Sequence, residues 1–306
     1  WTLVDDYSGD TFFDNWYFYD YADPTHGNVD YLGESDAYAA GLAYINDKGQ
    51  AITAVDSTNN YSYGVNRPSV RLQSKNSYAT GLVLWDIEHM PVGCAVWPAL
   101  WSNGPGTWPY GGEIDLLEGV GDQPWNSVTL HTANGCNATA SSSTNLYSGT
   151  LNRENCYAYA NPTGGCAITK GTTKSPAYGS GVNALGGGIY AVQFDTTGIT
   201  AWYIPRASIT TDITNGAPTP SKWIEPMAKY SPDSCDFETY FGAQTLIVTM
   251  TLCGDWAGST NVYGSNWAGN GERYCPGNCT ARVMTGSNFE DAYFTFNSVK
   301  VYQQLS

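Results

Sequence analysis

Apolar and polar residues alternate in short runs along this chain, which is the pattern of β-strands that bury one face. One hairpin is predicted from alternating runs over residues 190–194 and 199–203, with Asp195-Thr-Thr-Gly198 as its turn. The same reasoning predicts further strands over the ranges 70–73, 81–88, 128–132, 245–252 and 293–302. Helical periodicity is scarce, so the pattern favours an all-β fold.

The residues between these runs support the same conclusion. The chain has 34 glycines and 15 prolines, the residues that punctuate many short strands. The stretch 134–188 is rich in Gly, Ser and Thr, yet it contains three cysteines, and we expect long, cross-linked surface loops there. No internal repeat or low-complexity linker divides the chain. We therefore predict a β-sandwich of two packed antiparallel sheets, formed as a single domain over residues 1–306.

The charge balance excludes some partners. The 306 residues are 42% hydrophobic, enough for a sizeable core, and 13 basic against 28 acidic side chains give a formal net charge of −15. Such a chain lacks the basic groove that a nucleic acid requires, and it does not suit an anionic membrane surface. No apolar run approaches the ~20 residues that cross a membrane as a helix.

The cysteine count indicates an oxidising compartment. An even number without a CxxC pair favours disulfides over a zinc site, and their pairing is left open: Cys94, Cys136, Cys156, Cys166, Cys235, Cys253, Cys275 and Cys279. Three triplets are glycosylation acceptors, at Asn60, Asn137 and Asn278. The chain starts without a charged segment followed by an apolar stretch, so we expect a mature, secreted, extracellular form.

One segment concentrates carboxylates in an otherwise apolar run, Glu113-Ile-Asp115-Leu-Leu-Glu118. On a strand, residues 113 and 115 share a face while 118 falls on the other. A β-bulge near 116–117 would return Glu118 to the face of the other two acids, and bulges commonly re-aim side chains beside active sites. The alternative is an edge strand whose acids only discourage aggregation.

This motif resembles the catalytic motif of glycoside hydrolase family 16 in its bulged Glu-x-Asp-x-x-Glu form. Most of the chain shares the resemblance, which is closest to the fungal endo-1,3(4)-β-glucanases called laminarinases or lichenases. The matching segments are Trp97-Pro-Ala-Leu-Trp101, Leu130-His131-Thr132, Cys253-Gly-Asp-Trp256-Ala-Gly258 and Ser298-Val-Lys-Val-Tyr302. The resemblance implies a β-jelly roll with a concave substrate cleft.

The resemblance also implies roles for the three acids. Glu113 would be the nucleophile, Glu118 the acid/base, and Asp115 would sit between them and assist. A retaining glycosidase needs one ionised and one protonated carboxyl group about 5–5.5 Å apart. Three close acids do not all carry charge, so at least one keeps its proton near working pH.

Aromatic and polar side chains would bind the sugar. Trp101, Trp108 and Trp256 match positions that line the family's cleft, and an indole covers the apolar face of a pyranose ring. For Trp97, inside an apolar run, we favour core packing. His131 matches a histidine that hydrogen-bonds the sugar on the leaving-group side, and a structural histidine is the competing interpretation.

The assignments at the far end of the cleft rest on weaker matches. Arg71 resembles a basic residue that contacts remote sugars, although a structural salt bridge explains it nearly as well. The segment from Asp23 to Asn28, with His26, is expected to approach the same sugars, while His89 is expected to be structural. The three scattered histidines give no support for a metal, and no cofactor is expected.

The leading hypothesis is a secreted, endo-acting hydrolase of β-1,3 or mixed β-1,3/1,4 glucans. We expect a monomer whose partner is its β-glucan substrate. A lectin-like protein is the second hypothesis, and the acid trio weighs against it because sugar binding alone does not require three acids on one face. A transglycosylase is the third, since it uses the same glycosyl-enzyme intermediate. Agarases and carrageenases share the motif but usually have more basic clefts. The preferred linkage is left open.

Overall fold

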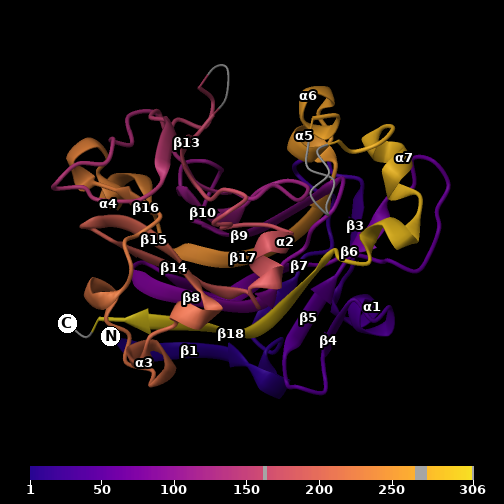
Figure 1. The fold of residues 1–306 in the computed structure, drawn as a ribbon, viewed down its shortest axis with the longest axis horizontal. Coiled ribbons are helices and arrows are strands. Elements are labelled where there is room, and N and C mark those ends of the chain that lie inside the picture. Colours follow the sequence, from indigo (N-terminus) through magenta and orange to yellow (C-terminus); the bar gives the residue numbers. More distant parts are fainter. Residues whose placement is uncertain (161–163, 266–273, 305–306) are drawn as a thin grey trace.

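The computed structural model describes residues 1–160, 164–265 and 274–304, and it consists mostly of two eight-stranded antiparallel sheets packed face to face (Figure 1). The β8 sheet has the order β16-β15-β14-β8-β18-β5-β4, with β1 paired to β18. The β10 sheet has the order β12-β13-β11-β10-β9-β17-β7-β2. Strands β3 and β6 form a small parallel pair. The predicted all-β sandwich is therefore confirmed.

The strands of the β8 sheet are β1 (Thr2–Ser8), β4 (Ala43–Ile45), β5 (Ala51–Ala54), β8 (Gly81–His89), β14 (Gly188–Asp195), β15 (Gly198–Pro205), β16 (Ala228–Tyr230) and β18 (Tyr293–Gln303). The strands of the β10 sheet are β2 (Trp16–Phe18), β7 (Arg71–Tyr78), β9 (Val96–Asn103), β10 (Glu113–Glu118), β11 (Asn126–His131), β12 (Thr150–Arg153), β13 (Cys166–Lys170) and β17 (Gln244–Leu252). The small pair is β3 (Val29–Tyr31) and β6 (Arg67–Ser69).

The helices of the described residues are short and lie in the connections. The α-helices are α1 (Glu34–Ala39), α2 (Ser180–Ala184), α3 (Thr211–Thr214), α4 (Phe237–Tyr240), α5 (Gly254–Ala257), α6 (Thr260–Tyr263) and α7 (Cys279–Val283). Single 3-10 turns span Gly9–Thr11, Arg206–Ser208, Pro220–Lys222, Pro232–Ser234 and Gly286–Phe289. Within the described ranges, no helix has the length and hydrophobicity needed to cross a bilayer.

The predicted hairpin forms as β14 and β15, closed by the pair Asp195 and Gly198. The expectation of surface loops over 134–188 was wrong in part, because β12 and β13 extend the β10 sheet within that stretch and α2 follows them. The sequence pattern missed these strands because β12 alternates only between exposed and half-buried residues. A strand at the sheet edge buries too little to show apolar periodicity.

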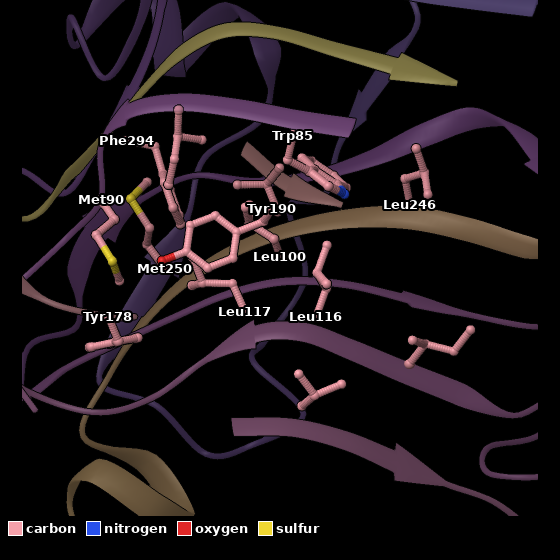
Figure 2. Packing of buried hydrophobic residues seen from close by; sticks show 14 of the residues in the cluster. Trp85, Met90, Leu100, Leu116, Leu117, Tyr178, Tyr190, Leu246, Met250 and Phe294 are labelled. Carbon is pink, nitrogen blue, oxygen red and sulfur yellow. The ribbon is translucent and has the colours of Figure 1, made fainter. Parts of the chain in front are cut away.

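The main core lies between the two sheets, where apolar side chains from strands far apart in sequence point toward one another (Figure 2). Trp85 and Phe294 come from the β8 sheet, and Leu100 and Leu246 from the β10 sheet. A second cluster lies on the outer side of the β8 sheet, where Trp202 packs against Trp223. Burial on both sides of the β8 sheet leaves the outer side of the β10 sheet as the free face.

Four disulfides pair all eight cysteines, as the even count predicted. The bonds are Cys94–Cys275, Cys136–Cys235, Cys156–Cys166 and Cys253–Cys279. Three of them close loops across elements that are distant in sequence, with separations of 181, 99 and 26 residues. Such cross-links restrict the unfolded chain and stabilise the long connections around the β10 sheet.

Candidate active site

A β-bulge in β10 places the three acids on one face, as the sequence predicted. Asp115 lies opposite Trp101 of β9 and Leu117 lies opposite Leu100, so Leu116 is the extra residue. Leu116 and Leu117 are consecutive yet both fully buried in the core, which a regular strand does not allow. Glu118 consequently returns to the outer side of the sheet, which we call the catalytic face.

Asn126 holds the bulge in place with its buried side-chain amide. Its Nδ2 donates to the carbonyl oxygen of Leu116 at 2.8 Å, and its Oδ1 accepts from the Glu118 N–H at 2.9 Å. Strand β11 pairs with β10 only from Glu113 to Asp115. Beyond Asp115, the Asn126 amide replaces the backbone hydrogen bonds that would otherwise continue between the two strands. The role of Asn126 is not predictable from the sequence, where its only signal is a polar residue at the start of an apolar strand.

Two indoles fix the two glutamates. The Trp108 Nε1–H donates to Glu113 Oε2 at 2.9 Å, and the Trp97 Nε1–H donates to Glu118 Oε1 at 3.0 Å. The expectation that Trp97 packs in the core was wrong: it is only half-buried, and its ring meets Trp256 edge-on at 5.5 Å. Successive side chains of a strand point to opposite faces of the sheet. Val96 and Pro98 on β9 are buried, so Trp97 between them points to the outer side.

Asp115 lies between the glutamates along β10 and faces His131, which is on the neighbouring strand β11. His131 Nε2 is 3.3 Å from Asp115 Oδ2 and 3.7 Å from Glu113 Oε1. Gly165 packs directly on this imidazole, where an added Cβ would come within 2.6 Å of His131 Cε1. The imidazole therefore has a fixed place beside two of the acids.

Burial makes ionisation of this cluster costly. Loss of hydration raises the pKa of Asp115 from 3.8 to about 8. Burial, and then the charge of Asp115, raises the pKa of Glu113 and of Glu118 from 4.5 to about 8. His131 and the indole N–H donors oppose these shifts. The cluster therefore retains protons near neutral pH, and its titration belongs to the group rather than to single residues.

Arg71 lies on the catalytic face away from the acids. Its guanidinium is over the ring of Tyr19 at 4.4 Å and over the ring of Trp101 at 5.2 Å. Arg71 is buried, yet among the described residues it forms no ion pair, and its Nε has no hydrogen-bond partner. The structural salt bridge considered for Arg71 is therefore absent from the part of the chain that the structure describes.

Trp101 is fixed by a hydrogen bond from its Nε1 to Thr249 Oγ1 at 2.8 Å. Trp256 is half-buried in α5 and reaches the acids through its contact with Trp97. The structure thus brings Trp101 and Trp108 next to the acid strand, and Trp256 one ring further out.

The segment from Asp23 to Asn28 is pinned beside the end of β17. The Asn28 N–H donates to the carbonyl oxygen of Leu252 at 2.7 Å, and the buried Asp23 carboxylate accepts from the Gly27 N–H at 3.1 Å. His26 is exposed and contacts Asp255, next to Trp256, at 2.9 Å. This segment therefore borders α5.

The remaining predicted residues lie away from the acids. His89 is on β8 in the other sheet, stacked on Tyr293 at 3.9 Å. Asn60, Asn137 and Asn278 are exposed, as glycosylation would require. Asn278 Oδ1 also caps α7 by accepting from the Ala281 N–H at 2.8 Å.

The scattered histidines gave no reason to expect a metal, but three acid-site residues are close enough to hold a cation. Ligand atoms of Glu113, Asp115 and His131 lie within 4.8 Å of one another. The same closeness follows from the strand register, which sets Glu113 opposite His131.

Comparison with known proteins assigns the chain to a class of carbohydrate-active protein. Residues 16–302 match the family model described as the XgeA-like, catalytic GH16 domain. The chain belongs to glycoside hydrolase family 16.

Particular relatives make this assignment finer. The chain is 40% identical over 306 residues to a probable endo-1,3(4)-β-glucanase of Aspergillus fumigatus. The aligned region covers 98% of this chain and 45% of the relative. It therefore spans less than half the length of that relative. Laminarinase 16A of Phanerochaete chrysosporium, solved with β-glucans in its donor and acceptor sites, has a TM-score of 0.90 at 36% identity, with 99% of each chain covered. A solved elongating family 16 β-1,3-glucosyltransferase gives a TM-score of 0.87, again at 36% identity and 99% coverage of both chains.

Proposed function

We propose that this chain is an endo-acting hydrolase of β-1,3 or mixed β-1,3/1,4 glucans that works by a retaining double displacement. The observation that carries the proposal is the bulge of β10, which sets Glu113, Asp115 and Glu118 on one face with an indole N–H on each glutamate. The names of the relatives and the sugar-bound neighbour support the same substrate class.

The two glutamates divide the chemistry. The Glu113 carboxylate attacks the anomeric carbon, while Glu118 gives its proton to the leaving oxygen, and a glycosyl-enzyme ester forms. Glu118 then takes a proton from the water that hydrolyses this ester. The raised pKa of the buried cluster supplies a carboxylic acid at near-neutral pH, which the first step needs.

The neighbouring residues prepare this chemistry. Trp108 holds one oxygen of Glu113 and so orients the carboxylate for attack. Asp115 and His131, 3.3 Å apart, lie beside Glu113. The charge of Asp115 raises the pKa of Glu113, and His131 lowers it. Trp101 and Trp256 offer ring faces to the sugars, and Arg71 offers N–H donors to their hydroxyl groups. No cofactor takes part in this scheme.

Transglycosylation is the second candidate function, because a solved neighbour at 36% identity is described as an elongating β-1,3-glucosyltransferase. Transfer uses the same intermediate and differs only in whether water or a sugar hydroxyl attacks it. Products longer than the supplied oligosaccharide would reveal this activity.

The direct experiment is incubation with laminarin, lichenan and cellulose, followed by identification of the products. Oligosaccharides of several lengths are expected from laminarin or lichenan, and Glu118→Gln should release none. Addition of EDTA should leave turnover unchanged, whereas its loss would assign a cation to Glu113, Asp115 and His131. No product from any β-glucan would contradict the proposal.

Secretion, glycosylation and a monomeric state complete the proposal. Four disulfides suit an oxidising compartment, and the three acceptor asparagines are exposed. The net charge of −15 favours a soluble chain without self-association.

A further inference from the structure

The strand register defines a straight row of side chains across the catalytic face. Asp115 of β10 lies opposite Trp101 of β9, and Trp101 lies opposite Ile247 of β17. Ile247 lies opposite Gln73 of β7, and Gln73 lies opposite Tyr17 of β2. Directly paired residues point to the same side of a sheet, so this row leads from the acid cluster to the sheet edge. Strands β10, β9, β17 and β7 follow one another in this order in Figure 1.

Tyr17 ends the row with an open ring. Its neighbours Trp16 and Phe18 point to the other side, where Trp16 is buried in the core, while Tyr17 is 61% exposed. The Lys75 ammonium lies over the Tyr17 ring at 5.5 Å, and it is itself held by the carbonyl oxygen of Asp14 at 2.7 Å. One side of the ring is thus supported by a fixed cation, and the ring remains accessible.

The residues between Tyr17 and the acids carry unused hydrogen-bond capacity. The Gln73 side chain is half-buried, and its amide is not bonded to any side chain or backbone group in the part of the chain that the structure describes. Arg71, two residues before Gln73, is only 6% exposed, and its Nε is unpartnered between the rings of Tyr19 and Trp101. The buried, unpartnered Arg71 Nε is a costly arrangement that hydrogen bonding to a bound sugar would relieve.

We propose that Tyr17, with Gln73, forms an outer sugar subsite that binds the remote glucosyl residues of a long β-glucan chain. This inference rests on the proposed function. Four strand spacings separate β10 from β2, about 19 Å at about 4.8 Å each, so only a chain of several sugar rings reaches Tyr17 from the acids. The aromatic ring would cover a pyranose face while the Gln73 amide bonds its hydroxyl groups.

The test compares substrates of increasing length. For wild type and Tyr17→Ala, kcat/KM is measured on β-1,3-linked oligosaccharides from the shortest that is cleaved up to laminarin. Tyr17→Ala should lower the ratio of kcat/KM on long substrates to that on short ones by about two- to tenfold, the scale of one aromatic contact. Tyr17→Phe should retain the wild-type ratio, because the ring remains.

Tyr44→Ala is the matched control. Tyr44 is also the exposed middle residue of a three-residue edge strand, β4, but it belongs to the other sheet. Its substitution should leave the length dependence unchanged. An equal length dependence in wild type and Tyr17→Ala would overturn the outer subsite while the hydrolase proposal stands. No turnover of any β-glucan by the wild-type chain would overturn both.

Discussion

At the scale of single residues, the acids were identifiable from sequence because charge is scarce in an apolar run. Only 13% of the residues are charged, so three carboxylates within six positions stand out. Their supporting residues were not identifiable in the same way. Trp97 alternates with buried residues, and only the pleat of β9 shows that its indole turns to Glu118. Arg71 had two interpretations, and only its contacts separate stacking from an ion pair.

The buried Asp115 carboxyl gives a prediction about stability. Its pKa is raised from 3.8 to about 8, so between these values the folded chain holds a proton that the unfolded chain has released. The free energy of unfolding contributed by this group therefore falls as pH rises through that window. Asp115→Asn stays neutral, and its melting temperature should rise relative to wild type as pH increases from about 4 to 8.

Thermal unfolding across that pH range, monitored by circular dichroism, measures the effect. Asp47→Asn, which removes an exposed acid, is the control and should show no such pH-dependent gain. The same Asp115→Asn variant should lose activity, because an amide beside His131 and Glu113 is unable to take up or release a proton. A melting-temperature difference that is flat with pH would contradict the raised pKa.

At the scale of elements, the bulge was predictable but its support was not. Side chains alternate along a strand, so Glu118 reaches the face of Glu113 and Asp115 only if one extra residue lies near 116–117. The strand register places this residue at Leu116. The amide that bonds this bulge comes from Asn126 on the next strand, and this contact between strands leaves no pattern in the sequence that predicts it. The pairing of the cysteines was open for the same reason, since 105 pairings fit eight cysteines.

The bulge predicts that Asn126 positions the acid/base. Asn126→Ala leaves the Leu116 carbonyl and the Glu118 N–H without partners, at about 1–3 kcal/mol each. Turnover of natural glucans should fall by about tenfold or more, because Glu118 loses its fixed backbone. Aryl glycosides with a good leaving group need little protonation, so their turnover should fall much less.

Asn145→Ala is the matched control for this prediction. Asn145 is also a buried asparagine, and it bonds Thr139 and the carbonyl oxygen of Lys229, away from β10. Its loss should lower the melting temperature without changing the dependence of rate on the leaving group. An equal fall on both substrate types in Asn126→Ala would mean that Asn126 is structural only.

At the scale of the whole molecule, the fold leaves one sheet face free for a polymer. The β8 sheet is covered on its outer side by Trp202 and Trp223, while the outer side of the β10 sheet carries the acids and the stacked arginine. The segments with β13 and with α5 and α6 rise beyond this face (Figure 1). The alternating runs predicted the two sheets, but not β12 and β13, whose position follows from pairing with β11. A face that carries the acids and extends across the strands of one sheet suits an enzyme that attacks within a chain.

The most direct test of the whole account is the anomeric configuration of the first products, followed by proton NMR during early hydrolysis of laminarin. The bulge places Glu113 and Glu118 on one face for a double displacement, so the products should appear first in the β configuration and convert to the equilibrium mixture later. Initial release of the α-anomer would mean a single, inverting displacement, and it would contradict the assignment of Glu113 as nucleophile.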